Sequence, residues 1–568
     1  MASLRLPRQT FSLSLLLGVL GGAVFLVSFA AGRAFLRDIE PVQRWLAWFQ
    51  PRATLACGAL CLLGLMACRR EIWDATRGIS RADWLMVAGV LALAAATRIA
   101  WVPASERLYF DEHAYCQIAD AIASEGMAQL AGAGRMVAGR LVTDLPVHEH
   151  WPAGWPTALA IALQATGGAH GAGPALNLIL TLCTTLLVAL IASRARPAGR
   201  LPLVAATLHA CVPAVGLWSR TGAAEPMAAF LGAAALFVAT VVARTPALRA
   251  QILLGAVCAL GAMTRNESLF IIPVALLVAG SRPAGFAWGH SLPALTIAIW
   301  LLPAQALHLG VVGRGYDADT RGSGLGLAFA SHNLASLGHY LTHEPVMMVL
   351  VLLAAFTAYR RAALPLIAWA VAGLVPWLFY FAGSLDYPGG ERFVLSWLSP
   401  CTILAAAGVI RLDAYCARWR PAGLRMVVGS AYVVACLAWL TIYVRRADAG
   451  VAIPRREIAA LRLALRNVPQ DGVVAAAYPF VILAEHRSAI PLADADSPRR
   501  ICALVRRRTE KVFLWIGPAV RPAARLRRDR SVDDLTNRCD VVPADAGDGT
   551  AGGGRLYEVR DCTDCLGT

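Results

Sequence analysis

Long apolar segments alternate with short polar ones over most of the chain, and this alternation limits the folds open to it. A bilayer core about 30 Å thick needs roughly 20 helical residues to cross it. The apolar segments that could form such helices are 11–31, 51–68, 84–102, 173–193, 201–218, 224–243, 250–264, 267–281, 288–312, 345–359, 362–383, 394–410 and 424–444. We therefore predict an all-α polytopic membrane protein with about 13 transmembrane helices.

The composition supports this class. Of the 568 residues, 58% are hydrophobic and only 15% are charged, a balance typical of multispanning membrane proteins. The net charge of +16 comes almost entirely from arginine, because Lys511 is the only lysine. Much of this charge lies in short segments between apolar runs, so nucleic-acid binding is not expected. The first apolar run lacks an A-x-A-like cleavage site, and we interpret it as a retained anchor.

Two apolar segments do not fit a single upright helix. The run 250–281 carries Arg265, Asn266 and Glu267 in its middle, and charges at the centre of a bilayer cost several kcal/mol. We predict two short helices with these residues at the turn between them. The segment Trp151–Gly167 is interrupted by proline and glycine and predicts an interfacial helix instead of a span.

Arginine is concentrated in alternate loops, which sets the predicted orientation. With the N-terminus in the cytoplasm, the arginine-rich loops are 69–83, 194–200, 244–249, 282–287, 360–361 and 411–423. Because positively charged loops remain in the cytoplasm, we expect a multi-pass protein of the bacterial inner membrane with its C-terminus outside. The predicted domains are N-terminal transmembrane helices at 1–83, a transmembrane core at 84–444 with an outer loop at 102–172, and an extracytoplasmic domain at 445–568.

Residues 445–568 are polar and mixed, unlike the rest of the chain. Pro454–Val468 has helical spacing, and short apolar runs follow it. These runs are Val473–Ala477, Ala489–Leu492, Val512–Ile516 and Leu556–Val559. The pattern predicts a small C-terminal α/β domain.

The cysteines divide between the two regions. Those within apolar runs are interpreted as small core residues. Outside them, Cys562 and Cys565 form a single CxxC motif with no second pair. A structural disulfide from this motif to Cys539 is favoured over zinc, which usually takes four ligands, and over redox catalysis. The full pairing among Cys502, Cys539, Cys562 and Cys565 is left open.

Polar residues gather on the predicted outer face. The segment Leu108–Tyr115 (LYFDEHAY) places Asp111 and Glu112 directly after an apolar segment, at the start of a predicted helix. We expect this helix to rest on the membrane through Tyr115, Ile118 and Ile122. Other polar groups on this face are His148, Glu149, His150, Arg220, Glu225, Arg265, Glu267, Glu391, Arg392 and the predicted loop 313–344. Acids and arginines at helix ends indicate an enzyme or a substrate pathway that opens there.

Five motifs follow one another along the chain. They are FDEHAYCQIADAIASEG at 110–126, HEHWPAGWPTALAIAL at 148–163, SRTGAAEPMAAFLGAAAL at 219–236, GAMTRNESLFIIPVALL at 261–277 and GERFVLSWLSP at 390–400. In order and in predicted side they resemble the integral-membrane C-type (GT-C) glycosyltransferases, which include protein O-mannosyltransferases and aminoarabinose transferases. The resemblance covers roughly residues 84–445. The acidic loop follows the third predicted span instead of the family's first, which two additional N-terminal helices or a different number of spans would explain.

The resemblance implies transfer of a sugar from a polyprenyl-phosphate-linked donor to a lipid, glycan or protein acceptor on the outer face, with no required cofactor. A carboxylate can take the proton of the acceptor hydroxyl, and arginine binds phosphate through paired donors. We expect Asp111 to be the base, with Glu112 as its orienting partner or as the alternative base. The candidates for binding the donor phosphate are Arg265, Arg392 and Arg220. The candidates for other substrate contacts are His113, Tyr115, His148, Glu149, His150, Glu225, Glu267 and Glu391.

These residues also have structural explanations. Asp111 could cap the helix 112–125, and Arg392 could be a topology anchor. Arg265 and Glu267 could form a mutual ion pair. The residues His113, His148, Glu149 and His150 could bind a divalent metal, or the histidines could simply be solvated loop residues.

Two other classes of protein stay open. An O-antigen ligase or polymerase also uses lipid-linked sugars but relies mainly on arginine and histidine of its outer loops. A transporter predicts inverted halves with helices broken at mid-membrane. The acidic pair before a helix favours the glycosyltransferase.

Overall fold

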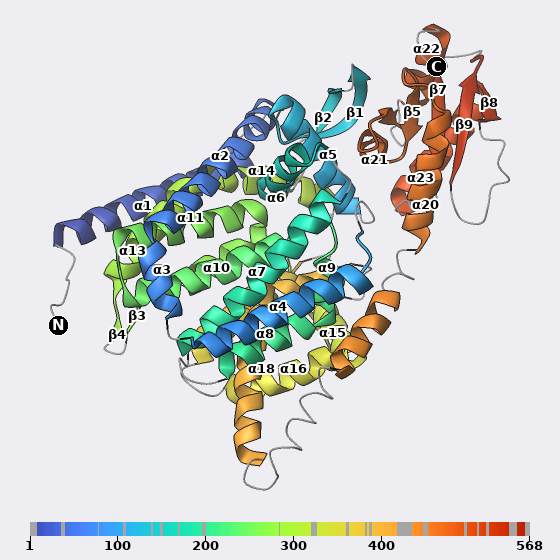
Figure 1. Ribbon diagram of the computed structural model, residues 1–568. Helices are drawn as coiled ribbons and strands as arrows, with labels where there is room; N and C mark the ends of the chain where they lie inside the picture. Colours follow the sequence, from blue (N-terminus) through green and yellow to red (C-terminus); the bar gives the residue numbers. More distant parts are fainter. Residues whose placement is uncertain are drawn as a thin grey trace. The chain divides into compact units, whose positions relative to one another are not determined.

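Figure 1 shows the computed structural model, which describes residues 8–562 except 36–39, 78, 106–109, 138–139, 148–150, 169–170, 196–199, 283–284, 320–325, 359–362, 381–382, 386–388, 417–433, 447–451, 493–496, 508–510, 518–521 and 545–553. The chain folds into two compact units. One comprises Met1–Ser105, His150–Ala158 and Gly168–Arg445, and the other comprises Glu106–Glu149, Leu159–Gly167 and Arg446–Thr568.

The first unit is a helical bundle. Its elements are α1 (Arg8–Ala30), η1 (Ala31–Phe35), α2 (Glu40–Ala67), α3 (Arg69–Thr76), α4 (Arg81–Trp101), α7 (Ala172–Ala195), α8 (Leu201–Cys211), α9 (Pro213–Trp218), α10 (Glu225–Arg244), α11 (Leu248–Thr264), η2 (Asn266–Phe270), α12 (Ile271–Gly280), β3 (Ser281–Arg282), β4 (Gly285–Phe286), α13 (Trp288–Leu301), α14 (Pro303–Asp319), α15 (Leu327–His343), α16 (Pro345–Ala358), α17 (Leu364–Leu378), η4 (Gly390–Val394), α18 (Leu395–Cys416) and a helix at 434–446. Near its centre, α7 packs against α8 and α10 (Figure 1).

The outside of this bundle is apolar. Large side chains such as Leu26, Leu62 and Leu85 are exposed on it, as expected for a surface in contact with lipid tails and not with water. Among the residues that the structure describes, six helices are long and apolar enough to cross a membrane. Two bent pairs, α13 with α14 and α15 with α16, raise that number to eight if each pair is one span. The prediction of a multispanning membrane protein is confirmed, whereas the count of 13 spans stays a prediction.

Local breaks in the helices follow the sequence. As predicted, the run 250–281 forms two helices, and Arg265 lies in extended backbone between them. The segment Trp151–Gly167 contains a separate short helix, α6 (Gly154–Ala165). The interpretation of 313–344 as a loop is wrong, because the end of α14 and all of α15 lie within it. α15 and α16 meet at Glu344 with a bend of 107°.

The second unit is an α/β fold around one seven-stranded sheet. Its strands are β1 (Leu130–Val137), β2 (Arg140–Val147), β5 (Val473–Ala476), β6 (Ser488–Pro491), β7 (Val512–Ile516), β8 (Asp540–Pro543) and β9 (Arg555–Arg560), in the order β2-β1-β6-β5-β7-β9-β8. Its helical elements are α5 (Phe110–Glu125), α20 (Ala452–Ala464), η5 (Leu465–Asn467), α21 (Pro479–Leu483), α22 (Ser497–Arg507) and α23 (Pro522–Thr536), with the second half of α6.

The sheet confirms the predicted α/β character of the C-terminal region. Strands β5 and β6 pair in parallel, as do β5 and β7, and β8 and β9 add antiparallel strands at one edge. The antiparallel hairpin of β1 and β2 extends the sheet at the other edge, next to β6. That strands from the loop after α4 join this sheet was not predicted from the sequence.

The helix α5 also differs from expectation in its environment. Tyr115 and Ile118 are buried, and α5 packs against β1, β2 and α21. The prediction that Tyr115 and Ile118 rest on the membrane is therefore wrong, whereas Ile122 is half-buried. The sequence shows only that one face of α5 is apolar, and in the structure protein covers that face.

Candidate active site

The centre of the candidate site is Glu225, the first residue of α10. Pro226 follows it, and proline is favoured there because the first helical N–H groups have no partner within the helix. A carboxylate at a helix N-terminus is stabilised by the helix dipole. The buried side chain of Asn177 on α7 donates hydrogen bonds to the carbonyls of Thr221 and Ala223, at 2.8 Å each. Asn177 thus fixes the loop that leads into Glu225.

Two arginines bind the same oxygen of Glu225. Its Oε1 lies 2.9 Å from Nη1 of Arg265 and 3.0 Å from Nε of Arg392. The Nε of Arg265 also lies 2.7 Å from Oε1 of Glu267. The arginine side chains are only 12% and 14% exposed and that of Glu225 only 5%. The predicted Arg265–Glu267 pair is therefore present, as part of a cluster in which these ion pairs join two arginines to two glutamates.

Aromatic rings border this cluster. The Cζ of Arg265 lies 5.5 Å from the centroid of the Trp377 ring, and that of Arg392 lies 6.0 Å from the Trp218 ring. Phe393 stacks on Trp377 at 3.7 Å between centroids. Such faces attract guanidinium groups, so they help to hold both arginines beside Glu225.

The backbone around Trp377 and Arg392 is tightly constrained. A Cβ at Gly373 of α17 would lie 2.6 Å from the carbonyl oxygen of Ser396 on α18. Ser396 accepts a hydrogen bond from the Trp377 indole at 3.2 Å and donates one to the Gly373 carbonyl at 2.9 Å. Gly389, directly before η4, has a φ of +86°, which favours glycine. These features fix the entry of Arg392 into the site.

A narrow hollow of about 20 Å³ adjoins the cluster. Its lining residues are Glu225, Ala228, Glu267, Ser268, Ile271, Gly373, Trp377, Arg392, Phe393 and Ser396. A hollow of this size holds about one water molecule. A phosphate does not fit in this hollow as it stands.

The motif at 148–163 meets two of the other motifs at the same place. A Cβ at Gly154 would lie 2.6 Å from the Met263 carbonyl oxygen, next to the end of α11. The buried indole of Trp155 donates a 2.8 Å hydrogen bond to the carbonyl of Gly222. Three of the motifs therefore converge here: 148–163, 219–236 and 261–277. Glu225, in the second of them, contacts Arg265 of the third and Arg392 of the motif at 390–400.

The second unit carries the acidic pair. Asp111 and Glu112 lie in the first turn of α5, which begins at Phe110. Asp111 is partly exposed, whereas Glu112 is fully buried and His113 nearly so. The suggestion that Asp111 caps a helix starting at 112 is wrong, since Asp111 is already helical. A carboxylate in the first turn still interacts favourably with the helix dipole.

Not every predicted residue joins these two groups. Arg220 accepts a hydrogen bond from the Ser105 N–H at its carbonyl, and it lies outside the ion-pair cluster. Glu391 does not line the hollow. The proposed metal ligands His148, Glu149 and His150 lie outside the described residues.

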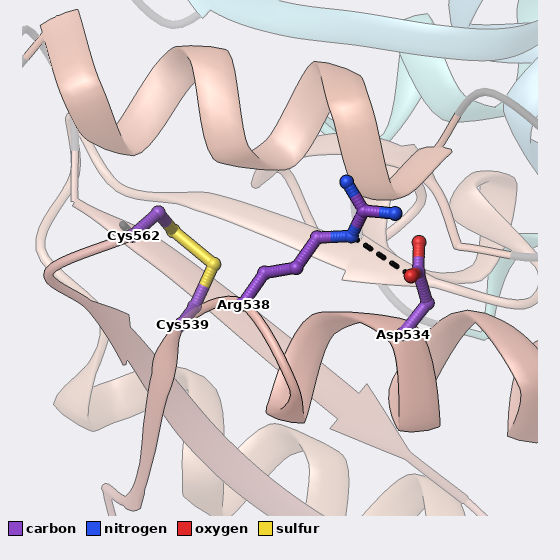
Figure 2. The surroundings of a disulfide bond; sticks show 4 residues. All are labelled: Asp534, Arg538, Cys539 and Cys562. Carbon is purple, nitrogen blue, oxygen red and sulfur yellow. Dashed lines mark hydrogen bonds and ion pairs between the residues drawn. A yellow bond between two sulfur atoms is a disulfide. The ribbon is translucent and has the colours of Figure 1, made fainter. Parts of the chain in front are cut away.

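Figure 2 shows the disulfide between Cys539 and Cys562, beside the ion pair of Arg538 with Asp534 at 2.8 Å. The predicted bridge to Cys539 is confirmed, and it leads from Cys562. Cys502 is close, since the three sulfur atoms lie within 4.8 Å of one another. Two of these sulfurs form the bridge, so the group does not have the thiolates that a zinc site needs. Cys565 lies outside the described residues.

Four residues of the site were not predicted from the sequence: Trp377, Trp218, Trp155 and Asn177. The tryptophans lie in or beside apolar runs, where they look like core residues. Asn177 had a usable signal, because an isolated amide within an apolar span usually has an interhelical partner.

The fold is shared with known proteins. Two crystal structures of ArnT from Cupriavidus metallidurans, one in the apo state and one bound to undecaprenyl phosphate, each superpose with a TM-score of 0.53 at 12% identity. Each match covers 84% of this chain and 98% of ArnT. The Archaeoglobus fulgidus oligosaccharyltransferase gives a TM-score of 0.44 at 13% identity over 75% of this chain and 68% of that one. No protein-family model and no curated protein sequence matches the chain.

The likeness to ArnT confirms the resemblance to the GT-C glycosyltransferases at the level of the fold.

Proposed function

We propose that this protein transfers a sugar from a polyprenyl-phosphate-linked donor to a lipid, glycan or protein acceptor on the outer face of the bacterial inner membrane. The fold supports this proposal, since the similar ArnT structure contains bound undecaprenyl phosphate. The observation that carries it is the arrangement of Arg265 and Arg392 around one oxygen of Glu225.

This arrangement suits a lipid phosphate. Paired guanidinium groups bind phosphate oxygens with charge-assisted hydrogen bonds. The hollow beside them is too small for a phosphate, so the anion would replace Glu225 as the partner of one or both arginines. Glu225 would then hold the arginines in position while the donor is absent. Arg220 is assigned a secondary role in the approach of the phosphate.

Sugar transfer also needs a base that takes the proton of the acceptor hydroxyl. We assign this role to Asp111, with Glu112 as its orienting partner or as the alternative base, because a carboxylate at the start of α5 can accept a proton. The sugar would pass through an oxocarbenium-like state as the bond to phosphate breaks. Contacts to the donor or the acceptor are assigned to His113, Tyr115, His148, Glu149, His150, Glu267 and Glu391. No cofactor is required by this scheme.

The organisation of the second unit supports the proposed sidedness. The loop after α4 and the C-terminal region fold together, so they must lie on the same side of the membrane. The predicted topology satisfies this condition, because it places ten spans between them and both outside. We retain 13 spans with the C-terminal region in the extracytoplasmic space as part of the proposal.

Binding of undecaprenyl phosphate to the purified protein tests the proposal. Saturable binding to the wild type, weakened by Arg265→Ala and Arg392→Ala in folded protein, is the expected result. Normal binding by both variants would exclude the arginine assignment. The donor itself can be found as the lipid-linked sugar that accumulates when the chain is deleted.

Two alternatives are distinguished by activity. A transporter would move the lipid-linked sugar across a proteoliposome membrane without forming a glycosylated acceptor. An O-antigen ligase or polymerase would lose activity when its outer histidines and arginines are replaced, but would keep it in Asp111→Asn and Glu112→Gln.

A further inference from the structure

The hairpin of β1 and β2 belongs to the same sheet as the C-terminal strands, although more than 300 residues separate them in the chain. Gly134 of β1 pairs with Ala489 of β6 in antiparallel fashion. Strand β6 in turn pairs in parallel with β5 along its whole length. The hairpin thus continues the C-terminal sheet at what would otherwise be its open edge.

Side chains strengthen this junction. The backbone N–H of Met136 donates a 3.0 Å hydrogen bond to the hydroxyl of Ser488, which is buried at the start of β6. Ala131 of β1 is fully buried in one hydrophobic core with Leu461 of α20 and Ile482 of α21. An edge strand held by both hydrogen bonds and a shared core does not behave as a separate loop.

The same hairpin holds α5. The side chain of Gln117 is fully buried, and its Oε1 accepts a 2.9 Å hydrogen bond from the N–H of Ala131. At the end of the helix, the amide of Gln129 donates to Glu125 at 2.7 Å. α5 also packs against α21, which connects β5 to β6. The helix that carries Asp111 is therefore fixed to the sheet from both β1 and the C-terminal region.

We propose that the C-terminal region is part of the catalytic apparatus, with Ser488 and Gln117 as positioning residues that hold α5, and with it Asp111, through strand β1. This inference rests on the proposed function. The chain of contacts runs from Ser488 to Met136, along β1 to Ala131, and through Gln117 to α5. Loosening any link changes the position of the proposed base without removing a group that binds the donor phosphate.

Ser488→Ala and Ser488→Thr form a matched pair for the test. Threonine keeps the hydroxyl that accepts the Met136 hydrogen bond, whereas alanine removes it. In folded protein, Ser488→Ala is expected to lower turnover of the lipid-linked sugar isolated from a deletion strain by roughly 3- to 10-fold, the effect of one lost hydrogen bond. The KM for the donor should stay unchanged, and Ser488→Thr should retain most of the turnover.

A disulfide can close the junction covalently. Gly134→Cys with Ala489→Cys places two thiols on directly paired residues. Pro543→Cys with Tyr557→Cys also joins directly paired residues, at the far edge of the sheet, and is the matched control for cross-linking. After oxidation of purified protein, the first pair should cross-link, keep wild-type turnover, and restore turnover when combined with Ser488→Ala.

Three results would overturn the inference: cross-linking of the control pair alone, loss of turnover on cross-linking the first pair, or wild-type turnover in Ser488→Ala. Asp111→Asn in the same assay separates this inference from the proposed function. An inactive Asp111→Asn beside a fully active Ser488→Ala removes only the positioning role. A fully active Asp111→Asn removes the base on which that role depends, and so overturns both.

Discussion

Arg265 and Arg392 share a single carboxylate oxygen of Glu225, although they lie far apart in the chain, Arg265 between α11 and η2 and Arg392 within η4. Two buried guanidinium groups this close repel each other unless an anion lies between them. Glu225 supplies that anion, and Glu267 neutralises the second positive charge from the side of Arg265. Exchange of Glu225 for a phosphate would preserve an anion between the arginines.

Loss of either arginine should weaken binding of the donor. A hydrogen bond to a charged group contributes about 1.5–3 kcal/mol, so Arg265→Ala and Arg392→Ala should each raise the Kd for undecaprenyl phosphate by roughly 10- to 150-fold. The Kd can be measured in detergent by titrating the lipid and following tryptophan fluorescence, since Trp377 and Trp218 border the site. Arg244→Ala, at the opposite end of α10, is the control and should bind normally.

Replacement of Glu225 should lower the thermal stability of the apo protein and increase the stabilisation that undecaprenyl phosphate provides. Glu225→Gln leaves the two arginines without their common anion, so the apo protein should lose thermal stability. Undecaprenyl phosphate restores a negative charge there and should raise the Tm of Glu225→Gln more than that of the wild type. An equal or smaller rise in the variant would show that the phosphate does not take the place of Glu225.

The membrane topology is open to labelling. In a background without other reactive cysteines, Ser331→Cys on α15 and a cysteine in the C-terminal region should react with a membrane-impermeant maleimide added outside intact cells. Positions in the predicted cytoplasmic loops 69–83 and 411–423 should react only after the membrane is made permeable. A C-terminal region protected in intact cells would mean that the predicted orientation is wrong.

The disulfide is expected to stabilise the C-terminal region, and this can be tested independently of activity. A bridge closing a loop of this size, between Cys539 and Cys562, typically stabilises by about 2–4 kcal/mol. Cys539→Ser with Cys562→Ser should therefore make this region cleavable at lower urea concentration in pulse proteolysis. Cys183→Ser, which removes a free cysteine of α7, should leave the cleavage midpoint unchanged. A midpoint unaffected by the double substitution would contradict a stabilising bridge.

Much of the fold could be predicted because hydrophobic length and charge are local properties. The break at Arg265 follows from the cost of a charge within a membrane, and the strands Val512–Ile516 and Val473–Ala476 follow from short apolar runs. The seven-stranded sheet could not be predicted in full. Gly134 pairs with Ala489, and nothing in the sequence near either residue indicates so distant a partner.

The candidate site was predictable in part for the same reason. Glu225, Arg265 and Arg392 are charged residues at the ends of apolar runs, which makes them conspicuous in the sequence. From the sequence we expected the adjacent pair of Arg265 with Glu267, and we expected Arg265 and Arg392 to bind the same donor phosphate. That Glu225 joins the two arginines depends on how the helices pack. Trp377 was overlooked because an aromatic residue in a span usually faces lipid or core.

The most direct test of sugar transfer with Asp111 as base is a complementation experiment. A deletion strain is supplied with the wild type or with Asp111→Asn, a substitution that keeps the side-chain size but removes the base. Mass spectrometry then measures the undecaprenyl-phosphate-linked sugar in the membrane, and quantitative blotting confirms equal expression. Loss of a general base lowers turnover by at least about 10²-fold, so the lipid-linked sugar should accumulate with Asp111→Asn as it does in the deletion, while the wild type returns it to the normal level. If Asp111→Asn also returns it to normal, Asp111 is not the base; accumulation with Glu112→Gln instead would assign that role to its neighbour.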